Sequence, residues 1–161
     1  MEENFDSEQF RRKTTDLKDE FVGISEDRMR HIISVARKAY KLAKENGCSE
    51  NFARKMFVLG FIHDIGYEFT QKDSHNDHVK IGSDLMYLLF GQTVAEIEEH
   101  GNPSTKNWAE LYFLNQADMT VGHNGVPCSV EERMEKAKER YGEQSMAYKK
   151  TVRLAKALHL F

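Results

Sequence analysis

The stretch MFVLGFIHDIG, residues 56–66, decides the fold of this chain. Its first seven residues carry no charge, and they end abruptly in His63 and Asp64. A run that is apolar on every side is typical of a helix buried inside a protein, and we expect this helix to begin near Ser49. Gly66 stands where a glycine commonly ends a helix, as the first residue beyond its C-terminus.

His63 and Asp64 are an unusual end for such a helix. A carboxylate at the end of a buried helix is costly unless another group pairs with it. A divalent cation would satisfy both side chains, and the negative end of the helix dipole favours a cation there. The alternative is a helix end at the surface, where Asp64 is hydrated and His63 caps backbone carbonyls. The apolar run and the partner residues described below favour the cation.

The composition of the chain favours helices. Its 161 residues suffice for one domain with its own core. Lys, Glu, Ala, Met and Leu are frequent, and the alternation of β-branched residues that marks strands is nearly absent. The sequence therefore predicts an all-α fold, a compact single-domain helical bundle. We expect residues 1–24 to form an N-terminal helical arm, and residues 25–161 to form the domain with a C-terminal helical extension.

Charge and cysteine content exclude several classes of partner. The net charge of −3 gives no bulk attraction to nucleic acid or to an anionic membrane. Cys48 and Cys128 are isolated, so we interpret them as reduced thiols of a cytosolic protein. No apolar run approaches the ~18 residues that span a bilayer, and the acidic N-terminus lacks the apolar segment of a signal peptide. We therefore expect a cytoplasmic protein that binds neither membranes nor long nucleic acids.

Capping and stop signals divide the chain into helices. Ser25 is an N-cap ahead of two acids, and Thr93 and Ser129 each open a capping box. The predicted helices are 25–45, 49–64, 78–91, 94–100, 107–119 and 130–141, with a last one from residue 145. The polar connection 67–76 is long enough to form part of an active-site rim.

Six histidine and aspartate side chains lie on inward-facing stripes or at the ends of these helices. They are His31, His63, Asp64, His78, His100 and Asp118. Asp118, for example, follows Leu111 and Leu114 by seven and four residues, so it faces inward with them. Imidazole and carboxylate ligands without a thiolate suit Fe, Mn, Zn, Co or Ni. Six ligands exceed one four-coordinate ion, so we expect one or two divalent ions, with Asp64 as the natural bridge of a pair.

Single members of this set have ordinary interpretations. A buried histidine such as His31 is more often a hydrogen-bonded residue of the core. His100 follows the core-side residues of a short helix, where an imidazole interacts favourably with the last carbonyls. The metal site is therefore predicted by the whole set and not by any one residue.

The order of these residues along the chain, His…His-Asp…His…His…Asp, resembles the HD-domain superfamily of metal-dependent phosphohydrolases. The HDIG form of its motif is present literally at residues 63–66, and His78 followed by Gly82 resembles the region of the third histidine. The resemblance covers roughly residues 26–119, and the chain after Asp118 resembles the extensions of small uncharacterised HD proteins.

This resemblance implies an all-α fold that carries a metal centre. One metal would be held by His31, His63, Asp64 and Asp118. In binuclear members, the positions that match His78 and His100 hold a second metal. His75 is a neighbouring candidate for the role of His78, although the spacing to Gly82 favours His78.

The residue after the motif departs from the superfamily pattern. Many members have a basic residue there, often associated with the substrate phosphate, whereas this chain has Tyr67. Lys72, Lys80 and Arg30 are the candidates for a contact with phosphate, although each is by default a solvated surface cation. We also interpret as solvated the basic face of the last helix, which carries Lys149, Lys150, Arg153 and Lys156.

The leading hypothesis is hydrolysis of a phosphoester or phosphoanhydride in a small nucleotide or similar phosphorylated compound. Asp64 would orient the attacking water as well as bind metal. His75, His123 or a water would give the leaving oxygen its proton. One alternative is a mixed-valence diiron oxygenase of the HD type, because a few proteins that resemble this ligand pattern activate O₂. Another is a non-catalytic HD module that only binds a ligand.

Overall fold

The computed structural model describes residues 22–71, 77–103 and 108–159. Its helices are α2 (Glu26–Glu45), α3 (Glu50–Ile62), α4 (His78–Phe90), α5 (Ala95–Glu99), α6 (Ala109–Met119), α7 (Val130–Tyr141) and α8 (Met146–Ala157), with a 3₁₀ helix, η1 (Ile65–Phe69), after α3. These ranges contain no β-strand, so the predicted all-α fold is confirmed. Within them, no helix combines the length and apolar character needed to cross a membrane. Residues 1–21 of the predicted arm, Lys72 and His75 lie outside them.

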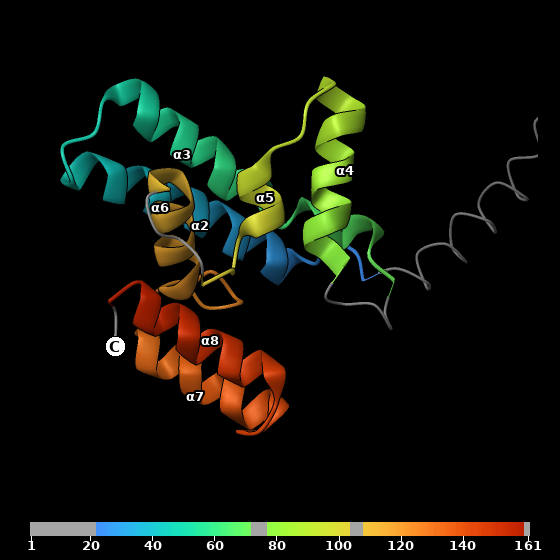
Figure 1. Ribbon diagram of the computed structural model, residues 1–161, viewed down its shortest axis with the longest axis vertical. Coiled ribbons are helices and arrows are strands. Elements are labelled where there is room, and N and C mark those ends of the chain that lie inside the picture. Colours follow the sequence, from blue (N-terminus) through green and yellow to red (C-terminus); the bar gives the residue numbers. More distant parts are fainter. Residues whose placement is uncertain (1–21, 72–76, 104–107, 160–161) are drawn as a thin grey trace, which may run out of the picture.

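The helices α2 and α3 form an antiparallel pair at the centre of the fold, and α6 packs against both (Figure 1). Ser25 caps α2 as predicted, and Ser49, near which α3 was expected to begin, caps α3. Each accepts a hydrogen bond from a backbone N–H of the first turn. The core of this part is made of buried residues of α2, α3 and α6, with Ile97 of α5. Because α2 buries apolar residues and packs against both α3 and α6, it is the central helix of this part.

The two central helices approach each other most closely at Gly60. A Cβ atom on this residue would lie 2.6 Å from the Cα of Ala36, so only glycine fits. In this register His31 of α2 lies opposite His63, which follows α3, and their ring centroids are 5.6 Å apart. The close approach of the backbones therefore determines the separation of two candidate ligands.

The end of α3 differs from the prediction. The helix ends at Ile62 with His63 as its C-cap, and Gly66 lies within η1 instead of just beyond α3. Gly66 is needed for another reason. A Cβ atom there would lie 1.8 Å from the carbonyl oxygen of His78, so the first turn of α4 packs directly on this glycine.

The prediction that α3 is buried on every side is wrong. Phe57, Val58 and Phe61 are 39%, 54% and 45% exposed. The buried residues of α3 recur every three or four positions, from Ala53 to Gly60, and face its helical neighbours. In a small bundle only one face of this helix is covered, and the opposite apolar side chains point to solvent.

The helices α4, α5 and α6 begin without a side-chain cap. The side chain of Asp77 makes no cap bond to α4, and α5 begins at Ala95 after Val94, without the capping box expected from Thr93. The first helical residue of α6 is Ala109, slightly later than predicted. These small shifts still leave His78 as the first residue of α4 and place a histidine at the end of α5.

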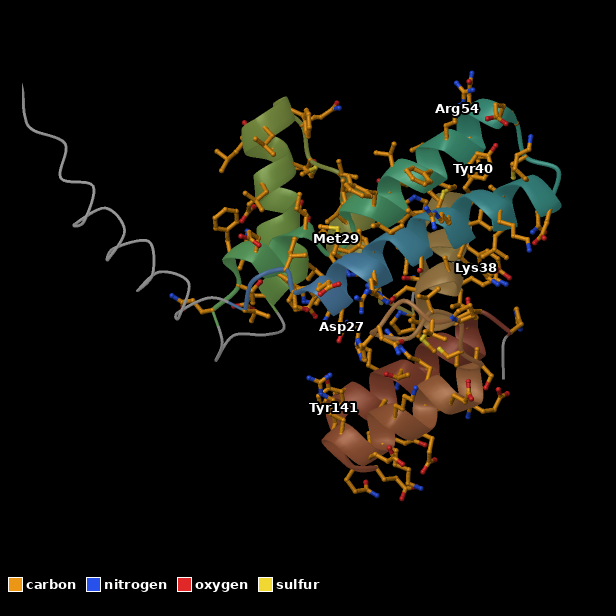
Figure 2. All side chains as sticks on the ribbon, turned by 180° about the vertical axis from the view of Figure 1, so that it is seen from behind. Asp27, Met29, Lys38, Tyr40, Arg54 and Tyr141 are labelled. Carbon is orange, nitrogen blue, oxygen red and sulfur yellow. The ribbon has the colours of Figure 1, made fainter. Side chains whose placement is uncertain are left out.

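The C-terminal helices α7 and α8 form a hairpin beside the end of α6, and Figure 2 shows it from behind with Tyr141 at the end of α7. The predicted capping box of Ser129 and Glu132 is confirmed, because both of its hydrogen bonds are present. A second apolar cluster joins the hairpin to Met119, the last residue of α6. The hairpin is therefore anchored next to Asp118.

Replacement of Gly60 tests the close approach of α2 and α3. We expect Gly60→Ala to lower the free energy of unfolding by at least about 1–3 kcal/mol, because extra atoms would be forced into a packed interior. Val58→Ala is the matched control on the exposed side of α3, and its effect should stay within about 0.5 kcal/mol. Chemical denaturation followed by circular dichroism measures both. Equal stability of Gly60→Ala and the unchanged chain would contradict the close approach.

Candidate metal centre

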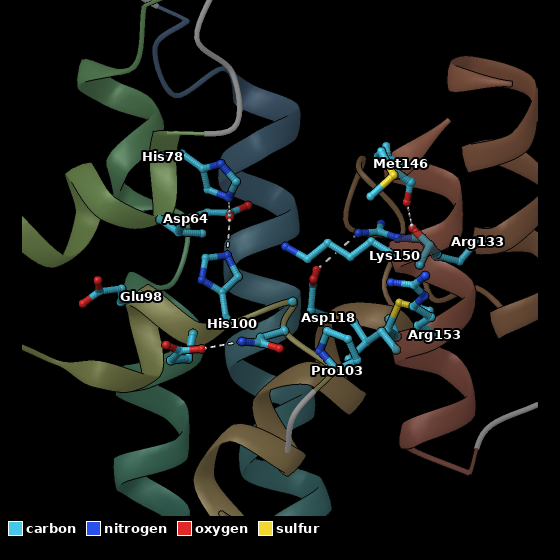
Figure 3. A pocket seen from close by; sticks show the side chains of 18 of the residues that line it. Asp64, His78, Glu98, His100, Pro103, Asp118, Arg133, Met146, Lys150 and Arg153 are labelled. Atoms are coloured by element: carbon cyan, nitrogen blue, oxygen red, sulfur yellow. Dashed lines mark hydrogen bonds and ion pairs between the residues drawn. The ribbon is translucent and has the colours of Figure 1, made fainter. Parts of the chain in front are cut away.

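The structure brings the six predicted side chains together. His31 lies within α2, His63 follows α3, Asp64 precedes η1, His78 opens α4, His100 follows α5, and Asp118 lies in the last turn of α6. Most of them stand at helix ends, where the chain changes direction and separate helices can converge. Figure 3 shows Asp64 between His78 and His100.

Asp64 is the residue around which the imidazoles gather, and it is only 4% exposed. Its Oδ2 atom lies 3.8 Å from Nε2 of His31 and 3.4 Å from Nε2 of His63. Its Oδ1 atom lies 3.6 Å from Nε2 of His78 and 3.4 Å from Nε2 of His100. Each carboxylate oxygen thus faces its own pair of imidazoles.

Backbone carbonyls orient three of these imidazoles. Nδ1 of His31 lies 2.9 Å from the carbonyl oxygen of Gly122, Nδ1 of His63 lies 2.7 Å from that of Gly60, and Nδ1 of His100 lies 2.5 Å from that of Ile97. A carbonyl oxygen only accepts, so each Nδ1 must carry the hydrogen and donate it. In the neutral ring the lone pair is then on Nε2, the atom that faces Asp64. This is the arrangement that metal-binding histidines adopt.

His63 provides the clearest sign of a missing partner. Its Nε2 atom is buried and has no hydrogen-bond partner among the described residues. A buried polar atom without a partner is costly, and a cation would satisfy it. His31, His63 and Asp118 each offer a ligand atom within 4.8 Å of the others, and so do His63, Asp64 and His100. The donor set therefore fits divalent ions with nitrogen and oxygen ligands.

The two carboxylates of the centre stay ionised. Burial alone would raise the pKa of Asp64, but the charges and hydrogen bonds of His63, His100 and Arg28 outweigh it and hold that pKa well below its usual range. Burial would likewise raise the pKa of Asp118, and the charge of Arg133 lowers it instead. Ionised carboxylates are the form that binds a metal.

The imidazoles respond to their surroundings in different directions. Burial lowers the pKa of His63, which favours its neutral form. Burial would also lower the pKa of His100, but the hydrogen bond and charge of Asp64 raise it. A proton on His100 and a metal at Asp64 compensate the same negative charge, so metal binding would displace that proton.

Arg28 is a functional candidate that the sequence analysis missed. Its guanidinium donates to Oδ2 of Asp64 at 2.7 Å and lies over the ring of Tyr67, 4.1 Å from the centroid. Tyr67 in turn stacks on His78, with ring centroids 4.1 Å apart. Tyr67 therefore holds a cation at the position where the motif itself supplies none. A signal for Arg28 was available, because it precedes His31 by one helical turn on α2.

The described candidates for phosphate binding that the sequence suggested are not brought to the centre. Arg30 is exposed and pairs with Glu26 and Asp27 on its own helix. Lys80 is exposed and pairs with Asp84 at 2.9 Å. Both cations form ion pairs with acids one turn away on the same helix, as surface charges on helices commonly do.

A cavity of about 640 Å³ opens at the metal centre (Figure 3). Asp64, His78, His100 and Asp118 line one side, and Arg133, Lys150 and Arg153 of the C-terminal hairpin line another. Lys150 and Arg153 are exposed, in agreement with their interpretation as part of a solvated face, and they also line this cavity. His123 also lines the cavity, and burial with the nearby charge of Arg133 lowers its pKa to about 4. A cavity of this size holds a ligand larger than a single phosphate.

Comparison with known protein families found a match over most of the chain. The family model described as HD domain matches residues 28–160. The match continues beyond residue 119, where the resemblance seen in the sequence ends, and it includes α7 and α8. Searches among curated proteins and among solved structures found no significant match.

Elemental analysis of the purified and reconstituted protein tests metal binding. We expect about two equivalents of a divalent transition metal per chain, because Asp64 faces two pairs of imidazoles. His78→Ala should lose about one equivalent, and Asp64→Asn should lose most of both, since the two ligand groups share Asp64. His159→Ala, at an exposed residue after α8, should lose none. Full metal content in Asp64→Asn would contradict the shared site.

Proposed function

Because this chain belongs to the HD-domain family, we propose that it is a metal-dependent phosphohydrolase. Its substrate would be a small phosphoester or phosphoanhydride, such as a nucleotide. The observation that carries the proposal is the position of Asp64 between two pairs of imidazoles, each pair facing a different carboxylate oxygen. A paired site of this kind suits phosphoryl transfer, in which charge on several oxygens must be neutralised at once.

The ligands divide into two groups in this proposal. His31, His63 and Asp118, with one oxygen of Asp64, make up the first group, and His78 and His100, with the other oxygen, make up the second. Fe, Mn, Zn, Co and Ni suit both groups. Divalent ions bound there would neutralise the phosphoryl oxygens and activate a water near neutral pH.

Arg28 is the cation proposed to contact the reacting phosphoryl group. Its guanidinium lines the cavity next to Asp64, and stacking on Tyr67 fixes its plane. Planar guanidinium groups bind phosphate oxygens through two parallel hydrogen bonds. Arg28 would thus take the place of the basic residue that many family members have directly after the motif.

The leaving oxygen needs a proton as its bond to phosphorus breaks. His123 lines the cavity, and its lowered pKa leaves the ring neutral near pH 7. A neutral imidazole still has one N–H group that can donate a hydrogen bond to the leaving oxygen. A water bound beside His123 would then deliver the proton.

Substitution of Asp64 tests the hydrolase proposal. We expect Asp64→Asn to reduce turnover of phosphoesters by at least about 100-fold with Mn, Co, Ni or Fe, because it removes the carboxylate shared by both groups. Asp84→Asn, at an exposed residue that pairs only with Lys80 among the described residues, should retain full activity. The measurement is phosphate release from a panel of nucleotides and model phosphoesters.

The same preparation separates the hydrolase from the oxygenase hypothesis. Turnover with a redox-inert metal such as zinc would support hydrolysis. Equal phosphate release by Asp64→Asn and the unchanged protein would contradict it. The oxygenase hypothesis would be supported instead if the iron-loaded protein takes up oxygen and gives an iron EPR signal but releases no phosphate.

Two arginines on α2 test the contact with phosphate. We expect Arg28→Gln to raise KM for a phosphoester by about tenfold or more, since one charge-assisted contact with phosphate is lost. Arg30→Gln is the matched control on the same helix, because Arg30 points away from the cavity toward Glu26 and Asp27. Steady-state kinetics of the metal-loaded proteins measure both. A larger increase of KM in Arg30→Gln than in Arg28→Gln would contradict the assignment to Arg28 and would indicate that Arg30 contacts the phosphate.

A further inference from the structure

The cavity has a cationic wall opposite the metal centre. Lys150 and Arg153 lie one turn apart on α8, and Arg133 of α7 lies beside them (Figure 3). These residues come from the C-terminal hairpin, which contributes none of the candidate metal ligands. Metal binding therefore does not account for this group of cations.

Lys150 extends from the hairpin toward the metal centre. In Figure 3 its side chain reaches from α8 past Asp118 toward His100. Its Nζ atom comes within 3.9 Å of the point where a Cβ on Gly101 would lie, and Gly101 directly follows His100. The Lys150 side chain thus extends across the space between the hairpin and the loop after α5, and its ammonium group lies next to that loop.

The side chains of Lys150 and Arg153 make no ion pair or hydrogen bond to the part of the chain that the structure describes, whereas the arginines nearer the metal ligands do. Arg28 binds Asp64, and Arg133 contacts Asp118 at 3.4 Å. The other acids that line the cavity, Glu98 and Glu99, have polar partners on their own side of it: Glu98 accepts from Ser83, and Glu99 accepts from Asn102. Two cations directed into a cavity without an acidic partner favour an anion from outside.

We propose that Lys150 and Arg153 bind a second anionic group of the substrate, apart from the group that reacts at the metal centre. The substrate class would be a phosphorylated compound with two separated anionic groups, such as a nucleoside bisphosphate or polyphosphate. The size of the cavity agrees with this, because about 640 Å³ exceeds what one phosphate fills. This inference rests on the proposed function for the identity of the reacting group, but the binding of the second group does not require turnover.

The same helix provides a control for the cationic wall. The four basic residues of α8 are all exposed, but Lys149 and Lys156 do not line the cavity. Reversing their charges changes the net charge of the hairpin as much as reversing those of Lys150 and Arg153. A difference between the two double variants therefore reports on position and not on the overall field of the protein.

Non-hydrolysable phosphonates test the second site by calorimetry on the Mn²⁺-loaded protein. The probes are alkane bisphosphonates with three-carbon and five-carbon spacers, each compared with the monophosphonate of the same chain length. We expect at least one bisphosphonate to bind about tenfold or more tightly than its monophosphonate. Lys150→Glu/Arg153→Glu should bring this ratio close to one, and Lys149→Glu/Lys156→Glu should leave it unchanged. Lys150→Gln, which removes the positive charge without introducing a negative one, should reduce the ratio in part.

The outcomes separate this inference from the proposed function. Equal binding of mono- and bisphosphonates with both spacers would overturn the second site, and so would an equal loss in both double variants. Loss of monophosphonate binding in Lys150→Gln as large as that of bisphosphonate binding would also overturn it, because Lys150 would then contact the first group. If no phosphoester is hydrolysed but the bisphosphonate ratio still depends on Lys150 and Arg153, the second site stands and the hydrolase proposal falls. Circular dichroism and metal content confirm that each variant is folded and loaded.

Discussion

A buried carboxylate that needs positive charge around it is the constraint on which this structure depends. Asp64 is almost without solvent contact, and its negative charge must be compensated inside the protein. Four imidazoles and Arg28 surround it, each directed at one of its two oxygens. Helices α2, α4 and α5 are therefore held at the end of α3, because a displacement of any of them would leave part of this charge unpaired.

Close backbone contacts place the helices where their side chains can compensate the charge of Asp64. Gly60 lets α2 reach α3, and Gly66 lets the first turn of α4 reach the segment after Asp64. Gly82 belongs to the same contact, since a Cβ on it would lie 3.4 Å from the backbone nitrogen of Gly66. The glycines allow the helix backbones to approach one another, and this approach brings the histidines within reach of Asp64.

The parts of this arrangement that the sequence predicts are those set by local rules. Inward-facing stripes and helix ends identify the side chains that meet at Asp64, and serine caps locate α2, α3, α7 and α8. The exposed side of α3 was not predictable from its apolar run, because an apolar run has the same sequence pattern whether or not a neighbouring helix covers each of its faces. Arg30 was suggested as a phosphate contact, but it pairs with Glu26 and Asp27, acids that were visible one turn away in the sequence. Arg28 shares a helix face with His31, yet its stacking on Tyr67 depends on tertiary structure.

The basic face of α8 marks the limit of local reasoning most clearly. Lys149, Lys150, Arg153 and Lys156 form one basic pattern in the sequence, and nothing in their spacing separates two of them from the others. The separation comes from the apolar cluster that joins the hairpin to Met119. Because Met119 directly follows Asp118, the packing that fixes a candidate metal ligand also fixes the angle of α8 over the cavity. A compound bound between the metal centre and Lys150 would therefore contact two parts of the fold whose relative position is fixed by the packing around Met119. Selectivity for the group of the compound that binds at Lys150 would then require no conformational change.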